Sequence, residues 1–263
     1  MLRGGTGWAG DGQRAPDSLD AVTFGIRGRP ARGPGTPGRT APAARISLGA
    51  LDLNLRAVIA STRSAVVDVR ADAWGHGVHV VAGRAIAAGA AGLLVDEHAR
   101  TALTGEVDPA LLEVTGEATK PEAVYGLTAG FTPVLSLRGT VLSFKGLRAG
   151  EGISYGYTYR APRDTVVALI TGGYAQGVVR SLGNAASVLI AGERHPIIGR
   201  VAMDVCVVEL GSHDAVRRGD DVVFFGEVAP GSPTLAEWSA ATGLTPAELV
   251  TAIGLRNDRE YVA

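Results

Sequence analysis

Apolar positions between residues 45 and 130 follow the spacing of helices and of short buried strands in turn. The first helical stripe is formed by Leu51, Leu55, Val58 and Ile59. The second is formed by Val78, Val81, Ala85 and Ile86. Short runs of strand length lie at 46–48, 65–69 and 92–95. This order of strand, helix and strand, with short connections, predicts a parallel sheet.

From residue 131 onward the pattern changes to short strands separated by turn residues. The runs lie at 132–142, 164–170, 187–190, 195–210 and 221–225. Their spacing predicts an antiparallel β domain. Near the end of the chain, Thr245, Pro246 and Glu248 predict a helix start. Threonine is favoured as the N-cap, proline at the first helical position, and glutamate at the third, where it closes a capping box.

Residues 1–44 show neither helical nor strand periodicity and are dense in Gly, Pro and Arg. This composition predicts a disordered leader. Two interpretations stay open: a basic tail for an anionic partner, or a segment without a role, which is either an unselected leader or the result of a wrongly placed start codon. The predicted organisation is therefore a leader at 1–44, an α/β segment at 45–130 and a β domain at 131–263.

Composition narrows the function classes. The 263 residues are 46% hydrophobic, which is enough for a sizeable core and for two domains. The 25 basic residues nearly balance the 26 acidic ones, so no overall field favours a nucleic-acid partner or an acidic membrane surface. The single cysteine, Cys206, cannot form an internal disulfide, and no apolar run approaches the roughly 20 residues that span a bilayer. We therefore expect a cytoplasmic protein that binds a small molecule or another protein.

Two stretches resemble the alanine racemases, which are amino-acid racemases dependent on pyridoxal phosphate (PLP). The first runs from residue 45 to 95 and contains RISLGALDLNLRAVI, VVDVRADAWGHG and AAGAAGLLVD. It resembles the first two βα units of the family. The resemblance implies that residue 70 replaces the lysine that carries PLP as a Schiff base, and residue 74 the tyrosine that contacts the cofactor phosphate. The chain has Arg70 and Trp74 at these positions.

The second stretch runs from about residue 123 to 226 and contains AVYGL, PVLSLRG, AGEGISYGYTY, GGYAQGVVRSLGN, VLIAG and PIIGRVAMD in the family's order. The resemblance implies that Tyr155 matches the second catalytic base, which the family supplies across a dimer interface. It also implies that Met203 and Asp204 match a pair in the partner's substrate pocket, and that Tyr174 matches a tyrosine at its entrance.

Two further positions depart from the family pattern. Gln176 stands where the family has an aspartate, and Leu255 stands where some members have another pocket tyrosine. The matched residues also have simpler interpretations. In the simpler interpretation, Tyr155 is a packed aromatic near a strand end, and Asp204 stabilises a turn. His76 is interpreted as a turn histidine bonded to backbone, and Cys206 as a small buried residue.

Arginine at position 70 conflicts with the family's chemistry. The family's lysine can form the imine with PLP and act as a base, because burial and neighbouring groups can lower its pKa enough to give a neutral, nucleophilic amine. The guanidinium of Arg70, with a pKa of about 12.5 or more, stays a cation that neither forms an imine nor removes a proton. It could still pair with a phosphate or a carboxylate.

The α/β segment is also short for a barrel. A (β/α)₈ barrel typically needs about 250 residues, whereas residues 45–130 suffice for about three βα units. The missing strands are those in which the family holds a histidine under the cofactor ring and polar groups around its phosphate. The family's arginine at the pyridine nitrogen is absent too, because no arginine lies between Arg100 and Arg138. Lys120, beside Pro121 in a loop-like stretch, is a poor substitute for the lost lysine.

Three functions remain open at this point. The chain is a catalytically inactive relative of the alanine racemases, or a binding partner of a full-length racemase, or a working racemase that interconverts L- and D-alanine for peptidoglycan. The expected fold is α+β: a partial (β/α) barrel remnant followed by an antiparallel β domain of alanine-racemase type. We expect no covalently bound PLP, and either a homodimer or a heterodimer with a full-length racemase. An incomplete barrel is expected to expose strand edges and apolar helix faces.

Overall fold

The structure is a computed structural model that describes residues 41–212, 214–226 and 231–263. The disordered leader expected at 1–44 lies outside the described residues as far as residue 40. Its last two residues do not fit that expectation, because Ala43 and Ala44 are buried in the first strand, β1 (Ala43–Ser47).

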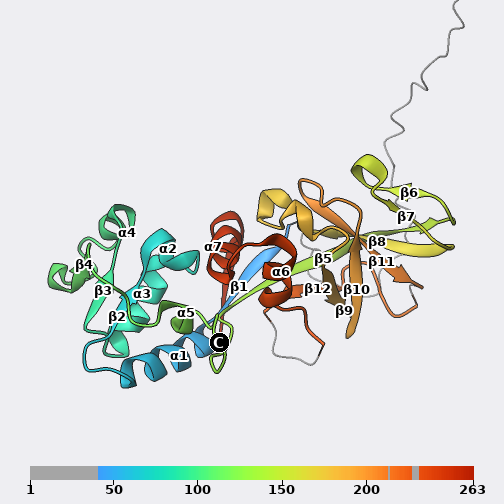
Figure 1. Cartoon of the computed structure of the whole chain (residues 1–263). Coiled ribbons are helices and arrows are strands. Elements are labelled where there is room, and N and C mark those ends of the chain that lie inside the picture. The colour runs from blue at the N-terminus through green and yellow to red at the C-terminus, as the bar shows by residue number, and fades with distance from the viewer. Residues whose placement is uncertain (1–40, 213, 227–230) are drawn as a thin grey trace, which may run out of the picture. The chain divides into compact units, whose positions relative to one another are not determined.

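An eight-stranded sheet organises the C-terminal part. Besides β1, its strands are β5 (Leu135–Leu147), β8 (Thr165–Thr171), β9 (Ser187–Ile190), β10 (Glu193–Ile198), β11 (Val205–Gly211), β12 (Asp221–Phe225) and β13 (Asp258–Val262). The strand order is β12-β9-β10-β11-β8-β5-β1-β13, and β12 also pairs with β5. This extra pairing closes six strands into a barrel and leaves β1 and β13 outside the ring. Figure 1 shows β1 beside β5, and β13 pairs with the other edge of β1.

The predicted antiparallel pattern is confirmed for the six strands of the ring. The exception in this sheet is the parallel pair β1–β13. The run predicted as one strand at 195–210 is two strands, because the chain turns between Ile198 and Val205. The predicted helix start is also confirmed: helix α7 (Pro246–Arg256) begins with the Thr245–Glu248 capping box. Strand β13 and helix α6 (Leu235–Thr242) were not predicted.

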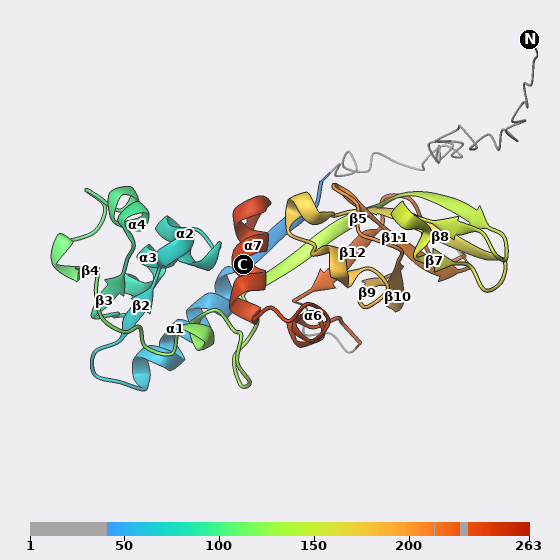
Figure 2. The same cartoon turned by 45° about the horizontal axis from the view of Figure 1, so that its top comes forward.

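Three short parallel strands form the sheet of the α/β segment: β2 (Val66–Asp68), β3 (Gly92–Leu94) and β4 (Leu112–Glu113). The helices of this segment are α1 (Leu48–Ala60), α2 (Arg70–Trp74), α3 (Val78–Ala87), α4 (Glu97–Ala102) and α5 (Pro121–Val124). Figure 2 shows α2, α3 and α4 grouped about the strands. The predicted order of strand, helix and strand and the parallel pairing are thus confirmed for the runs at 65–69 and 92–95. The extended piece predicted at 46–48 lies instead at the end of β1, in the eight-stranded sheet.

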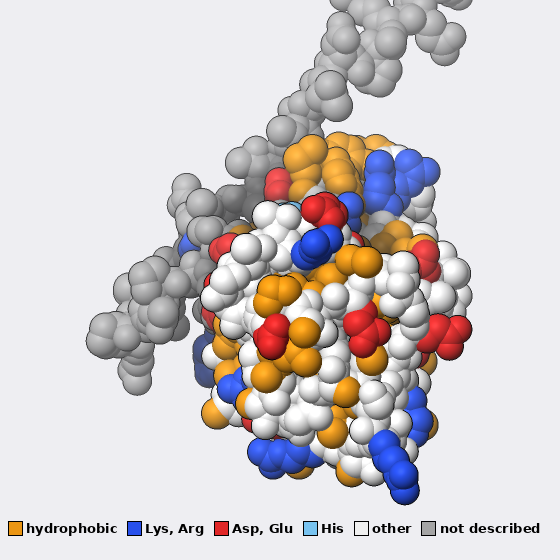
Figure 3. Space-filling model, turned by 90° about the vertical axis from the view of Figure 1, so that its left-hand side faces the viewer, with side chains coloured by type: hydrophobic (Ala, Val, Ile, Leu, Met, Phe, Trp, Pro, Cys, Tyr) orange, Lys and Arg blue, Asp and Glu red, His pale blue; other side chains and the backbone are white. Residues whose placement is uncertain are grey.

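The edge of β2 is covered, contrary to expectation. The Thr119 backbone N–H donates to the Val66 carbonyl at 2.7 Å, and the Val66 N–H donates to the Thr119 hydroxyl at 3.1 Å. The chain therefore returns from β4 to the far side of the sheet and satisfies part of that edge itself. On the face shown in Figure 3, hydrophobic side chains lie interspersed with acidic and basic ones.

The core joins residues of both segments within the described chain. Helix α1 contributes Leu51 and Leu55, and the C-terminal part contributes Phe224, Phe225 and Trp238, all at 0% exposure in one contiguous cluster. Such burial, worth about 2 kcal/mol for each large side chain, fixes the sheet on which the candidate site residues stand. Among the helices of the described residues, none combines the length and the hydrophobicity of a membrane-spanning segment.

Candidate functional site

A left-handed turn follows β2 at the position of Arg70. The next four residues have φ angles of 51°, 55°, 53° and 54°: Ala71, Asp72, Ala73 and Trp74. A side chain in this conformation costs roughly 1–2 kcal/mol per residue, so the turn needs support. The Asp96 carboxylate accepts from the Ala71 N–H at 2.7 Å, and the Asp72 carboxylate accepts from the Val78 N–H at 2.7 Å. Strain of this kind gathers at functional sites.

Arg70 is bound to its own neighbour, Asp68. The Arg70 Nε and Nη2 atoms donate to the two carboxylate oxygens of Asp68 at 2.9 and 2.6 Å, and the Arg70 backbone N–H donates at 3.1 Å. The Asp68 side chain is 1% exposed, whereas that of Arg70 is 50% exposed. The hydrogen bond and charge of Asp68, helped by the charge of Asp96, raise the pKa of Arg70. The predicted ability of this arginine to pair with a carboxylate is thus realised within the chain.

Trp74 lies against Tyr125 rather than against a polar group. The two rings stack with centroids 5.1 Å apart, and the Tyr125 hydroxyl donates to the Asp68 backbone carbonyl. The His76 ring also packs against Tyr125, with the ring centroids 4.5 Å apart. Its Nδ1 lies 3.1 and 3.0 Å from the carbonyl oxygens of Ala73 and Trp74, which confirms the interpretation as a turn histidine. Burial lowers the pKa of His76 to about 4.

The C-terminal part also contacts this turn. Arg259, on β13, donates to the Asp72 carboxylate, and the Tyr261 hydroxyl donates to the His76 carbonyl at 3.2 Å. Sequence reasoning missed both residues, since no local pattern links the chain end to residue 72. It also missed Asp68, although a charged residue inside the apolar run AVVDV is a visible signal.

The β-domain residues expected at a partner's site are brought together by two loops. Between η3 (Tyr174–Gln176) and the β10–β11 loop, the Tyr174 N–H donates to the Ala202 carbonyl at 3.0 Å, and the Ala175 N–H donates to the Met203 carbonyl at 2.9 Å. The Gln176 side chain donates to the Asp204 carboxylate at 3.0 Å. Asp204 therefore ties the two loops, as its simpler interpretation requires, and it does so by accepting from the Gln176 amide.

Tyr155 stands on a third loop, η2 (Tyr155–Tyr157), which is anchored to the same region. The Ser154 hydroxyl donates to the Arg200 carbonyl at 2.6 Å. Tyr155 is 69% exposed and Met203 is 55% exposed, so the interpretation of Tyr155 as a packed aromatic is wrong. The Arg180 guanidinium lies 5.4 Å from the centre of the Tyr174 ring. We call Tyr155, Tyr174, Met203 and Asp204 the loop cluster.

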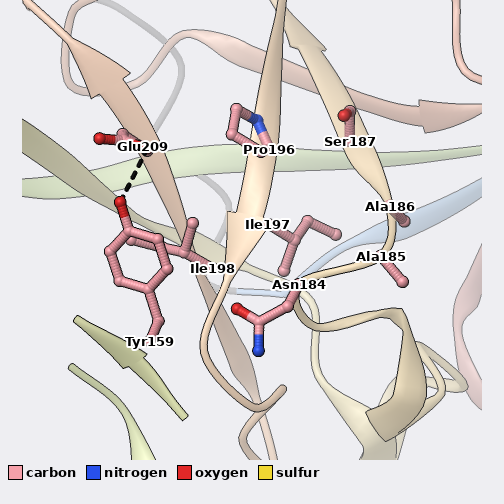
Figure 4. Close-up of a pocket in the computed structure, with 9 residues that line it drawn as sticks. All are labelled: Tyr159, Asn184, Ala185, Ala186, Ser187, Pro196, Ile197, Ile198 and Glu209. Carbon is pink, nitrogen blue, oxygen red and sulfur yellow. Dashed lines mark hydrogen bonds between the residues drawn. The ribbon is translucent and has the colours of Figure 1, made fainter. Parts of the chain in front are cut away.

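A pocket of about 260 Å³ lies elsewhere on the β domain (Figure 4). It is lined by Tyr159, Asn184, Ala185, Ala186, Ser187, Pro196, Ile197, Ile198 and Glu209. The Tyr159 hydroxyl donates to the Glu209 carboxylate at 2.9 Å, and burial together with this carboxylate raises the pKa of Tyr159 to about 12. None of the site residues expected from the sequence lines this pocket.

The residues present do not fit a covalently held PLP. Position 70, which the resemblance aligns with the family's lysine, holds Arg70, and its guanidinium is engaged by Asp68. The chain has two lysines, and neither lies on this turn. Lys120 precedes α5 and its Nζ donates to the Ser61 hydroxyl at 3.3 Å, while Lys145 lies on β5. Trp74 offers no hydroxyl for a phosphate. Among the residues that the structure describes, no group of histidine, cysteine and acidic side chains is placed to hold a metal ion.

Comparisons with known proteins agree with the barrel and its loops. The family model for the alanine racemase C-terminal domain matches residues 134–261. Residues 134–261 of this chain are therefore related to the C-terminal domain of the alanine racemases. The alanine racemase of Mycobacterium tuberculosis is 41% identical over 158 residues, which are 57% of this chain and 41% of that protein. The alanine racemase of Mycobacterium leprae is 42% identical over 147 residues, which are 53% of this chain and 38% of that protein. The matched region thus spans about two fifths of the curated relatives' length.

Solved structures show the same fold over a longer stretch. The alanine racemase from the D-cycloserine producer Streptomyces lavendulae gives a TM-score of 0.75 at 24% identity, covering 87% of this chain and 98% of that chain. The alanine racemase of Bartonella henselae, solved with covalently bound pyridoxal phosphate, gives 0.71 at 17% identity, covering 84% and 99%. At these identities the likeness concerns the fold alone.

Proposed function

We propose that this chain is a racemase-related protein without racemase activity of its own. The ion pair between Arg70 and Asp68 carries the proposal. Racemisation through PLP needs an amine that can hold the cofactor and then take a proton from the substrate. A guanidinium performs neither step, and here its Nε and Nη2 hydrogens already point at a buried carboxylate. We further infer that residues 45–130 are a barrel remnant, since three parallel strands with helical connections match the start of such a barrel.

The experiment uses the purified full chain. PLP is added, the visible spectrum is recorded, and the mixture is treated with borohydride and analysed by mass spectrometry. A full-length alanine racemase serves as the positive control. We expect no visible band from protein-bound pyridoxal, no trapped adduct on the α2 turn, and no conversion of L-alanine. A trapped adduct together with turnover would show that the chain is a working racemase.

The loop cluster favours a second role, as a binding partner of a full-length alanine racemase. Its members are held by hydrogen bonds between loops, yet Tyr155 and Met203 stay exposed. Tyrosine, methionine and arginine are enriched in protein interfaces, where large rigid side chains contribute most of the affinity. By resemblance these are the residues that a racemase subunit presents to its partner. We therefore propose that they dock on an intact racemase, with self-association of this chain as the alternative.

Size-exclusion chromatography with light scattering distinguishes binding to a racemase from self-association. The molar mass of the chain alone shows whether it self-associates, and a mixture with the Mycobacterium tuberculosis alanine racemase shows whether a mixed complex forms. We expect co-migration that the double variant Tyr155→Ala/Met203→Ala abolishes. The matched control is Leu53→Ala, which removes another exposed apolar side chain, on α1 (61% exposed). Separate elution of the two wild-type proteins would count against the binding role.

A further inference from the structure

The contacts of Asp68 set it apart from the other carboxylates of the α/β segment. It is the last residue of β2, and its side chain is 1% exposed. Both of its oxygens accept from Arg70, one from the backbone N–H and Nε, the other from Nη2. A buried carboxylate is stable only when paired. Asp68 therefore requires a cation at position 70.

The other groups that face position 70 reinforce this demand. Asp96, on the loop after β3, accepts from the Ala71 and Ala99 N–H groups, and its charge acts on Arg70. The Tyr125 hydroxyl donates to the backbone carbonyl of Asp68. Burial raises the pKa of Tyr125 well above its usual range, so the phenol stays neutral. The negative charges of Asp68 and Asp96 thus both act on position 70.

We propose that Asp68 is a specificity-determining residue, which keeps whatever cation stands at position 70 in an ion pair and so excludes carbonyl cofactors from the turn. This inference rests on the proposed lack of racemase activity and extends it, because it assigns the exclusion to a second residue. Imine formation needs the lone pair of a neutral amine to attack the carbonyl carbon, after which water leaves. A carboxylate beside the amine favours the protonated form, which has no lone pair to give.

Labelling of an introduced amine tests this directly. Arg70→Lys and Asp68→Asn/Arg70→Lys proteins are treated with PLP and borohydride at pH 8, and peptide mass spectrometry gives the label at position 70 relative to Lys120 and Lys145. PLP acts here as a general amine reagent, so no intact cofactor site is needed. We expect about tenfold less label at position 70 in the single variant, because an opposite charge at contact distance shifts a pKa by about one to three units.

The matched control is Glu117→Gln/Arg70→Lys, which removes an exposed negative charge outside the ion pair. It is expected to label like Arg70→Lys. Cys206 reports folding in each variant, since its buried thiol reacts with a thiol reagent only when the chain opens. If the Asp68→Asn/Arg70→Lys protein unfolds, the Arg70→Lys protein alone still tests the inference. Its labelling at position 70 should begin at a higher pH than its labelling at Lys120.

Equal labelling of the two folded variants would overturn the inference, as would a rise at position 70 at the same pH as at Lys120. Neither result bears on the proposed lack of racemase activity, because the wild-type arginine cannot form the imine in any case. A trapped adduct on the wild-type turn would contradict the proposed function instead. The two proposals therefore fail in different experiments.

Discussion

Arg259 and Asp72 form an ion pair across 187 residues of sequence. Arg259 lies on β13, which pairs with β1, and Asp72 lies in the left-handed turn after β2. The same guanidinium atom donates to the Gly75 carbonyl at 3.3 Å. The last strand of the chain therefore holds the strained turn in place, and four residues that would otherwise leave the left-handed region are kept there.

Removing this ion pair should loosen the turn. We expect Arg259→Ala to lower the free energy of unfolding by about 2 kcal/mol, because a partly buried carboxylate loses a charged hydrogen-bond donor. Urea denaturation measures the loss. Arg56→Ala, which removes an exposed arginine from α1, is the control and should change stability by less than about 0.5 kcal/mol. Equal stability of the two variants would mean that β13 does not support the turn.

The close approach of α7 to the turn predicts a strong effect of one methyl group. A Cβ at Gly254 would lie 2.1 Å from the Gly75 carbonyl oxygen, and α7 leaves it no space. We expect Gly254→Ala to destabilise the protein by about 3 kcal/mol through overpacking. Gly83→Ala on α3 is the matched control: its Cβ would meet nothing within 4 Å. Alanine there should stabilise the helix by about 0.5–1 kcal/mol. Thermal melts of both variants provide the comparison.

His76 gives the fold a dependence on pH. Its pKa of about 4 in the folded chain lies below the value of about 6.5 in an unfolded one. As the pH falls, the unfolded chain therefore takes up the proton first, and the contribution of His76 is complete above pH 6.5 and lost toward pH 4. We expect about 2 kcal/mol of stability to disappear between pH 8 and pH 5. His76→Gln should flatten that part of the urea-denaturation curve against pH; an unchanged slope would contradict the burial of an uncharged imidazole.

Cys206 should be inert until the chain opens. It is 1% exposed, its thiol donates to the Gly172 carbonyl at 2.8 Å, and burial raises its pKa, so little thiolate forms at neutral pH. Because it is the single cysteine of the chain, labelling with Ellman's reagent reports this site alone. We expect labelling in the native protein to be at least about a hundredfold slower than in 6 M guanidinium chloride. Fast native labelling would contradict the packing of β11 against the core.

The loop cluster shows how far a motif carries without the fold. The segments that contain Tyr155, Tyr174 and Met203 resemble a known family in sequence order, which indicated that they act together. Their exposure was not readable from the sequence, because an aromatic near a strand end is as compatible with a core as with a surface. The hydrogen bonds between separate loops, which only the tertiary structure shows, hold these segments at the surface.

Local order was determined by the sequence itself. The apolar stripes of α1 and α3, the capping box of α7 and the strand runs of the barrel depend on contacts within a few residues, which the residue pattern records directly. The arginine at position 70 is likewise a fact of the sequence, and its inability to form an imine follows from the chemistry of a guanidinium.

Only the tertiary structure decided what holds the left-handed turn and how the short parallel sheet ends. Arg259 meets Asp72, Gly254 meets Gly75, and Thr119 covers the edge of β2. Each pairing joins residues that are far apart along the chain, so no local pattern encodes it. The strain of the turn and the exposed edge of a strand are relieved by whichever groups the packing of the whole chain brings near.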